Sequence, residues 1–450
     1  MGRLTRRQFI KGAAAGAAGL ALTGSEPILA RPTLSLSKGV ARRSPPNLLF
    51  IHTDQQHFQA LSALGARHVR TPNMDRLVRR GTAFSLSYSA NPVCCPARAC
   101  WYTGLAASRN GMLSNAHKLS PDVPDLGQWL GARGYSPFYS GKWHVPGRDP
   151  RASFTCITAD LTGLGEHGDP VVSRSAQAFL TSYDGDKPFF LSLGFLQPHD
   201  CCYWVFARPG EVDKLPDGLL ERDLPPLPDN YEYHMDEPAT LRKHMDGIRK
   251  WTARWSPLQW RYYMWSYYRM VEMVDAEIGR VVDALEDSRF ASDTLIVWTA
   301  DHGDGLARRK MVQKWFLYDE AARVPLVVVP PGGGGEKLDD RHVVSGLDIP
   351  ATLCDYARAP SPPGCQGRSL RPILEGKPVQ WRVFAVAEAN ITGRMVRTPE
   401  YKLITYKDES PELLFDMRRD PWEMTNIAGE SRYADVVSEL NAKLAKWEQA

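Results

Sequence analysis

Short runs of consecutive apolar residues recur along the chain, and each run ends in a group of polar side chains. Runs of about four to eight apolar residues are typical of strands that are buried on both faces of a parallel sheet. Five segments fit this description: NLLFIHTDQQ, YSPFYSGKWH, PFFLSLGFLQPH, TLIVWTADHGD and VPLVVVPPG. We therefore expect a core of buried, mostly parallel strands.

Segments with helical periodicity lie between these runs, for example DLGQWLGARGY and residues 259–285. In the second segment, apolar side chains at helical spacing predict one buried face, made of Met270, Val274, Ile278, Val281 and Leu285. Strands that alternate with helices predict an α/β fold, in which a large, mixed, mostly parallel sheet is sandwiched by helices.

The pattern changes from about Gln380, where the strand-like pieces become shorter: RVFAVAEA, GRMVRT, YKLITYK and ELLFDM. A helix is expected to follow over residues 434–448. We predict a large domain over 47–378 and an α+β subdomain, a small antiparallel sheet with a helix, over 379–450. The segment 201–257 is rich in proline, charge and aromatic residues, which favours a long excursion near the site rather than core.

Polar side chains follow four of the predicted strands at the point where each strand ends. Because ligands of open α/β sheets bind beyond the carboxyl ends of the strands, these side chains should converge in one cleft. The groups are Asp54 with Gln55, Lys142 with His144, His199, and Asp301 with His302.

The N-terminus carries Arg6-Arg7 in TRRQFIKG, followed by a weakly apolar stretch over 12–24. This pattern resembles a twin-arginine export signal and is too short for a membrane span. We predict a signal peptide over 1–30, a linker over 31–46, export by the twin-arginine machinery, and a periplasmic or secreted protein without a membrane span after cleavage. A frayed basic terminus would explain less of the pattern.

The net charge of +4 resides at this terminus, where residues 1–44 hold eight Lys or Arg against one Glu, so residues 45–450 carry −3. That balance gives no indication of a nucleic-acid partner. Eight cysteines are too few for a disulfide scaffold of this size. Cys354 and Cys365 form a candidate local pair, although disulfide pairing does not follow from sequence.

Three cysteines crowd into NPVCCPARAC, residues 91–100. Adjacent cysteines rarely bond to each other, and paired metal-ligand spacing is absent. Cys94, Pro96 and Arg98 fit C-x-P-x-R. Together with ACWYTG, YSGKWH, TADHGD, DEAARVPLVV and LLFDMRRDPWEMTNIA, the motif resembles the type I, formylglycine-dependent sulfatases of the alkaline phosphatase superfamily.

This resemblance implies that a formylglycine-generating enzyme oxidises Cys94, with Pro96 and Arg98 as recognition elements, while Cys100 packs in the core. It also implies one divalent cation, held by Asp54, Gln55, Asp301, His302 and the modified Cys94. Oxygen-rich ligands favour Ca²⁺. Many family members have Asp-Asp and Asp-Asn where this chain has Asp-Gln and Asp-His, so Mg²⁺ and Mn²⁺ stay open.

The resemblance further assigns roles around the nucleophile. Arg98 would hold the formylglycine hydrate, Lys142 would bridge the hydrate and the sulfate, and His144 would be the base that expels sulfate. His199 and Lys314 would grip the sulfate and protonate the leaving oxygen. His117 remains a candidate substrate contact.

The expected function is hydrolysis of sulfate monoesters, on sulfated polysaccharide or aryl sulfates. One alternative is a phosphonate or phosphate ester hydrolase of the same superfamily, because fold analogy does not separate the two. The other is an unmodified, non-catalytic binder of sulfated glycans.

Overall fold

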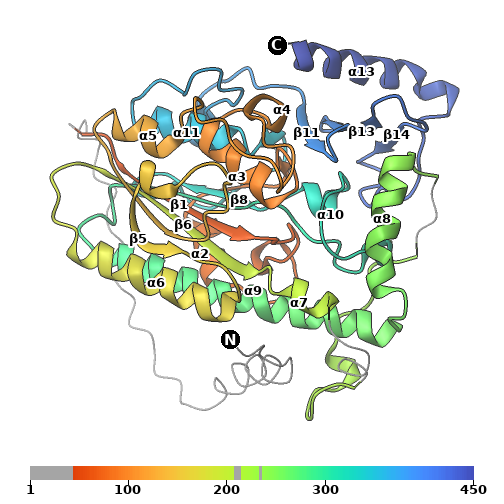
Figure 1. Ribbon diagram of the computed structural model, residues 1–450, viewed down its shortest axis with the longest axis horizontal. Helices are drawn as coiled ribbons and strands as arrows, with labels where there is room; N and C mark the ends of the chain where they lie inside the picture. The colour runs from red at the N-terminus through yellow and green to blue at the C-terminus, as the bar shows by residue number, and fades with distance from the viewer. Residues whose placement is uncertain (1–43, 207–213, 233–235, 450) are drawn as a thin grey trace.

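The computed structural model describes residues 44–206, 214–232 and 236–449. The predicted signal peptide, and the predicted linker as far as residue 43, lie outside the described residues. Figure 1 shows a layered arrangement in which a central sheet runs between two groups of helices, with the C-terminal helix at one end of the molecule.

The central sheet has eight strands in the order β5-β4-β6-β1-β7-β8-β2-β9. Neighbouring strands pair in parallel, except that β8 is antiparallel to both β7 and β2, so the predicted mixed, mostly parallel sheet is confirmed. The bounds are β1 Asn47–Asp54, β2 Thr82–Phe84, β4 Ser136–Gly141, β5 Thr155–Asp160, β6 Phe189–Pro198, β7 Thr294–Ala300, β8 Leu326–Val329 and β9 Lys337–Asp339. A separate pair joins β3 Ser87–Tyr88 to β10 Val344–Ser345.

Alternate residues of β1 face the two helical layers, as the period of a strand requires. Leu48 and Phe50 belong to the core under α3 Cys94–Thr103, α5 Leu126–Gly131 and α11 Asp348–Tyr356. Leu49 and Ile51 face the opposite core, under α2 Pro72–Arg80, α6 Gly165–Ser182 and α9 Pro257–Glu286. The shorter elements are α4 Ala107–Asn110, α7 Cys201–Val205, α10 Asp319–Ala322, α12 Arg371–Leu374, and the 3-10 helices η1 Ser62–Leu64, η2 Pro150–Ala152, η3 Glu221–Asp223, η4 Arg308–Lys310 and η5 Ser431–Tyr433.

Helix α9 begins at a capping box, in which the Ser256 hydroxyl accepts from the Gln259 backbone N–H and the Gln259 carboxamide accepts from the Ser256 N–H. Its predicted buried face is confirmed, because all five of the apolar side chains named above are at most 1 % exposed. The aromatic side chains of Tyr262, Tyr263 and Tyr267 are buried as well, in the part of the helix nearest to α7.

The prediction that 201–257 lies outside the core was wrong for its helices. Trp204 of α7, and Leu241, Met245 and Ile248 of α8 Ala239–Thr252, are buried in the same apolar cluster as Tyr263. Leu241, Met245 and Ile248 have the i, i+4, i+7 spacing of a helix face, a signal that the flanking proline-rich sequence obscured.

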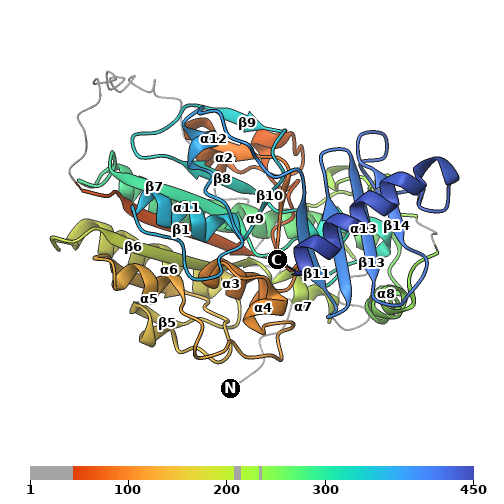
Figure 2. The same cartoon turned by 90° about the horizontal axis from the view of Figure 1, so that it is seen from above.

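The C-terminal region forms a four-stranded antiparallel sheet in the order β11-β12-β13-β14, as predicted. The strands are β11 Ala385–Ala389, β12 Gly393–Arg397, β13 Tyr401–Tyr406 and β14 Leu413–Asp416, and α13 Ala434–Gln449 follows them. Val396 and Leu403 face α13, whereas Met395 and Ile404 join the core that contains α8 and α9. The small sheet is therefore packed between its own helix and the rest of the molecule (Figure 2).

Helices long and apolar enough to cross a membrane are absent from the residues that the structure describes. All eight cysteines lie within those residues and are free thiols, so the candidate pair Cys354–Cys365 is not bonded here. Cys100 is fully buried, as predicted.

Candidate active site

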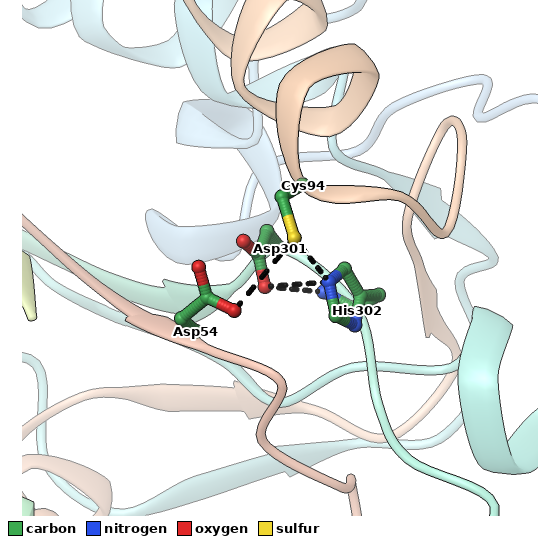
Figure 3. A group of neighbouring side chains, drawn as sticks. All are labelled: Asp54, Cys94, Asp301 and His302. Carbon is green, nitrogen blue, oxygen red and sulfur yellow. Dashed lines mark hydrogen bonds and ion pairs between the residues drawn. The ribbon is translucent and has the colours of Figure 1, made fainter. Parts of the chain in front are cut away.

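Four adjacent parallel strands, β4, β6, β1 and β7, deliver the predicted polar side chains to one edge of the sheet. Asp54 is the last residue of β1, Lys142 follows β4, His199 follows β6, and Asp301 follows β7. The convergence expected from the strand ends is therefore observed. Figure 3 shows Asp54, Asp301 and His302 from this edge facing Cys94 of helix α3.

Cys94 is the first residue of α3, and its side chain is buried. Its Sγ lies 3.2 Å from His302 Nε2 and 3.8 Å from Asp54 Oδ1. The N-terminus of a helix carries partial positive charge, which favours an anion at this position. In a modified protein, a formylglycine hydroxyl oxygen would take the place of this sulfur.

One ligand atom each of Asp54, Cys94, Asp301 and His302 lies within 4.8 Å of the others, and all four side chains are buried. Two carboxylates and an imidazole form a donor set that suits a hard or borderline divalent cation. The residues present therefore fit the cation that the sequence predicts.

Arg98 lies one turn further along α3 and forms ion pairs with the carboxylates of Asp54 and Asp301. Its Nη2 is 3.0 Å from Asp54 Oδ2 and 3.1 Å from Asp301 Oδ2, and its Nη1 donates to the Lys142 carbonyl. The Arg98 guanidinium thus balances the negative charge on the two Oδ2 atoms. The Oδ1 atom of Asp54 faces Cys94, and that of Asp301 faces the His302 ring.

Lys142 follows a point at which the backbones of β4 and β6 leave no room for a side chain. Gly141, at φ +105°, precedes it, and a Cβ there would lie 2.1 Å from the Gly194 carbonyl oxygen. Only glycine fits this contact. The Lys142 Nζ then lies 2.7 Å from Asp54 Oδ2.

Gln55 and Lys314 meet on the other side of Asp54. Gln55 has φ +68°, a conformation that non-glycine residues rarely adopt and that gathers at functional sites. Its backbone N–H donates to Asp301 Oδ1, and its Oε1 accepts from Lys314 Nζ at 2.5 Å. The structure thus brings both predicted residues into the site from segments 259 positions apart.

His144 and His199 are only partly buried, and the positive charge of His199 acts on Asp54. The Nδ1 atom of His144 is buried and has no hydrogen-bond partner among the described residues. His144 also has positive φ, +52°. The His117 Nδ1 lies 2.8 Å from the Ser114 hydroxyl, and its role as a substrate contact stays a prediction.

Neighbouring charges shift the pKa values of the site residues against the effect of burial. Burial and Asp54 raise the pKa of the Cys94 thiol, but Lys314, His302 and Lys142 outweigh them and bring it well below its usual value. Burial raises the pKa of Asp54, yet Lys142, His199 and Arg98 bring it well below its usual value. Burial lowers the pKa of His302, but Asp301 and Cys94 raise it to about 9. The centre is built to stabilise negative charge at position 94.

Sequence reasoning missed several side chains that contact these residues. His52 lies in the buried part of β1, with its Nδ1 3.4 Å from Arg98 Nη1. Asp304 accepts from the Gln55 side chain, and Cys202 lies against the same carboxamide. Asp304 falls inside the block TADHGD, so the sequence could have indicated that it belongs to the site. No sequence pattern indicates the same for Cys202.

Comparison with known proteins places the chain in a family. A model described as sulfatase matches residues 46–359, and one described as N-sulphoglucosamine sulphohydrolase, C-terminal, matches residues 308–450. A twin-arginine translocation signal model matches residues 3–23, so the N-terminus directs export to the periplasm or beyond.

Individual relatives agree with these matches. A Delta 4,5-hexuronate-2-O-sulfatase of Bacteroides thetaiotaomicron is 29 % identical over 89 % of this chain and 88 % of its own length. A solved 2-O GAG sulfatase has a TM-score of 0.80 at 28 % identity, covering 90 % of this chain and 92 % of the other. A phosphonate monoester hydrolase of Agrobacterium radiobacter, at 24 % identity and TM-score 0.77, covers 90 % and 95 % and shares the fold. The chain therefore belongs to the sulfatase family of the alkaline phosphatase superfamily and is a sulfuric ester hydrolase.

Proposed function

We propose that the exported protein removes sulfate from sulfated glycans, using a formylglycine at position 94 and one divalent cation. The observation that carries the proposal is the buried group of Asp54, Cys94, Asp301 and His302, with Cys94 on a helix N-terminus and at the start of C-x-P-x-R. Formylglycine supplies a hydrated aldehyde, whose first hydroxyl attacks sulfur and whose second allows sulfate to leave. A thiol offers only one such group.

The other side chains around position 94 would bind the cation and the hydrate. Asp54, Asp301, His302 and the Gln55 carboxamide oxygen would hold the cation, with Ca²⁺ expected and Mg²⁺ or Mn²⁺ as alternatives. When bound, the cation supplies positive charge next to the nucleophile and the sulfate. Arg98 fixes the two carboxylates by its ion pairs and, as the family pattern implies, would also hold the hydrate.

Lys142 and Lys314 bracket the centre from β4 and from the loop before α10, where they would bind the sulfate oxygens. His199 would protonate the leaving oxygen. His144 would remove the second hydroxyl proton, and its Nδ1, which has no hydrogen-bond partner among the described residues, is available to a substrate group.

A sulfated glycan is favoured over a small aryl sulfate because relatives are named for such substrates, among them the hexuronate-2-O-sulfatase and the 2-O GAG sulfatase. A phosphonate or phosphate ester hydrolase is the second candidate. It is favoured by the shared fold of the phosphonate monoester hydrolase and by the Asp-Gln and Asp-His pairs of this chain.

The deciding experiment compares matched aryl sulfate, phosphate and phosphonate esters with a panel of sulfated oligosaccharides, for protein co-expressed with a formylglycine-generating enzyme. Sulfate release should exceed phosphate release by at least about tenfold. A reversed preference would establish the alternative activity.

Mass analysis of the same protein locates the modification. The peptide that spans residues 94–98 should be lighter than its cysteine form, with the difference at Cys94. Cys94→Ala should be inactive, whereas Cys95→Ser, one position away, should keep most activity. Full activity with an unmodified Cys94, or glycan binding without any turnover, would overturn the proposal.

A further inference from the structure

The carboxamide of Gln55 lies between two groups of opposite hydrogen-bonding character. On one side, Nε2 donates to Asp304 Oδ2 at 2.7 Å. On the other side, Oε1 accepts from Lys314 Nζ at 2.5 Å. An ammonium group only donates, and an ionised carboxylate only accepts. The orientation in which oxygen faces Lys314 is therefore the one that satisfies both neighbours.

Asp304 is itself fixed by donors alone. Its Oδ1 accepts from the Tyr263 hydroxyl and the Leu306 backbone N–H, each at 2.8 Å, and its Oδ2 accepts from the Gln313 backbone N–H at 2.8 Å. The side chain is fully buried. With Gln55 included, four donors surround the carboxylate, which holds it in one position.

The remaining neighbours of the carboxamide do not decide its orientation. The thiol of Cys201 lies 3.4 Å from Gln55 Nε2, and that of Cys202 lies 3.4 Å from Oε1. A thiol both donates and accepts weakly, so it tolerates either end of the amide. Asp304 is thus the partner that distinguishes the nitrogen end from the oxygen end on the side away from Lys314.

We infer that Asp304 is a positioning residue, which fixes the Gln55 carboxamide so that its oxygen, and never its amino group, faces Lys314 and the cation site. The two ends of an amide are nearly equal in shape, so a half-turn exchanges them at little steric cost. After such a turn, an amino group would oppose the Lys314 ammonium. A carboxylate at position 55 would need no such device, because both of its ends are acceptors.

The inference rests on the proposed function where it concerns the cation, since only the amide oxygen can serve as a ligand. Second partners that orient metal ligands typically change metal affinity about 10- to 100-fold when they are replaced. Asp304→Asn keeps the shape of the side chain but can turn its own amino group toward Gln55, which removes the preference for one orientation.

Isothermal calorimetry with Ca²⁺ or Mn²⁺ alone tests this effect without reference to turnover. Asp304→Asn should bind the cation at least about tenfold more weakly than the wild type. Asp275→Asn is the matched control, because Asp275 is also buried and also accepts from two backbone N–H groups and one side-chain amide, that of Asn73. It should bind as the wild type does.

A double-mutant cycle with Gln55→Ala separates positioning from a general loss of structure. If Asp304 acts through Gln55, Asp304→Asn should have no further effect on affinity in the Gln55→Ala background. Wild-type affinity in Asp304→Asn, or effects that add in the double variant, would overturn the inference.

A second measurement needs neither a cation nor a folded Asp304 variant. In wild-type protein labelled with ¹⁵N in its glutamine side chains, the Gln55 amide signal is identified by its loss in Gln55→Ala. Its amino protons should exchange slowly with water, because Nε2 is buried and donates to Asp304. Rapid exchange would overturn the inference on its own. Failure of the wild type to bind a divalent cation would instead contradict the proposed cation site.

Discussion

His144 combines three properties that rarely coincide in one residue. It follows the strand end that carries Lys142, it has positive φ, and its Nδ1 is buried without a partner among the described residues. Leaving a buried polar atom unsatisfied costs about 1–3 kcal/mol, as does holding a backbone in a sparsely populated region. Such costs are typical of sites where substrate supplies the missing contact.

His144→Ala should therefore block the release of sulfate from the enzyme more than the attack on substrate. Loss of a general base typically lowers turnover about 10²- to 10⁴-fold. Intact-mass analysis after mixing with substrate should reveal accumulated sulfated protein. His342→Ala is the control, because that ring pairs with Asp339 of β9, the strand at one edge of the sheet. Turnover of His144→Ala at the wild-type rate would contradict the assigned role.

Strands β4 and β6 illustrate how an element, rather than a residue, places a catalytic group. The Lys142 backbone N–H donates to the Gly194 carbonyl at 2.8 Å, directly after the close approach of Gly141. A side chain at either glycine would push the strands apart. The position of Lys142 thus depends on the contact between the backbones of β4 and β6 and not on the lysine itself.

Gly141→Ala should displace Lys142 and reduce turnover at least about tenfold, since small shifts of a positioned group are costly. The substitution adds both a clash and a left-handed backbone. Gly134→Ala adds only the second, at φ +92° with no heavy atom within 4 Å of the new Cβ, and should cost about 1–2 kcal/mol of stability with activity retained. Steady-state kinetics and thermal unfolding of both variants separate the two effects. Equal activity of both would show that the close approach is unimportant.

At the scale of the whole molecule, a buried ionic cluster joins the C-terminal sheet to the segment that carries Lys314. Lys402 of β13 lies 2.9 Å from Asp319 of α10 and 2.6 Å from Glu423. Arg309, from η4 before Lys314, pairs with Glu320 and donates to the Glu423 carbonyl. The small sheet therefore buttresses the loop that supplies Lys314, and its contribution to the site is indirect.

The carboxylates of Asp319 and Glu423 both contact Lys402, but their pKa values shift in opposite directions. Burial raises the pKa of Asp319, but Lys402 and the nearby arginines lower it to about 2. Burial raises the pKa of Glu423 to about 7, against the pull of Lys402 and with the help of Asp319. Between pH 4.5 and about 7 the folded protein thus holds a proton on Glu423 that the unfolded chain releases. Stability should fall as pH rises through this window.

Glu423→Gln should flatten that dependence, because the amide keeps the neutral form at every pH. The unfolding equilibrium of the wild type should change by roughly 10²-fold more than that of the variant between pH 4.5 and 7. Denaturant unfolding at several pH values measures the difference. Glu400→Gln, a half-exposed position that pairs with Arg418, is the control and should follow the wild type. A pH dependence unchanged by Glu423→Gln would contradict the assignment.

Local sequence determined the elements and the chemistry of this protein to a large extent. Apolar runs that end in polar groups identified β1, β4, β6 and β7, because burial of a parallel strand on both faces requires an uninterrupted apolar run. The parallel arrangement then required Asp54, Lys142, His199 and Asp301 to meet at one edge. C-x-P-x-R and its companion blocks identified the family through residues that the chemistry needs.

Tertiary structure decided what depends on contacts between distant segments. Nothing local to Gln55 indicates that Asp304 and Lys314 fix the two ends of its amide, because these partners lie 249 and 259 positions away. The burial of α8 was hidden for the same reason, since its apolar face gains its partners only when other segments of the same apolar cluster fold around it. A sequence fixes which groups are available, whereas the free energy of an orientation depends on what surrounds each group after folding.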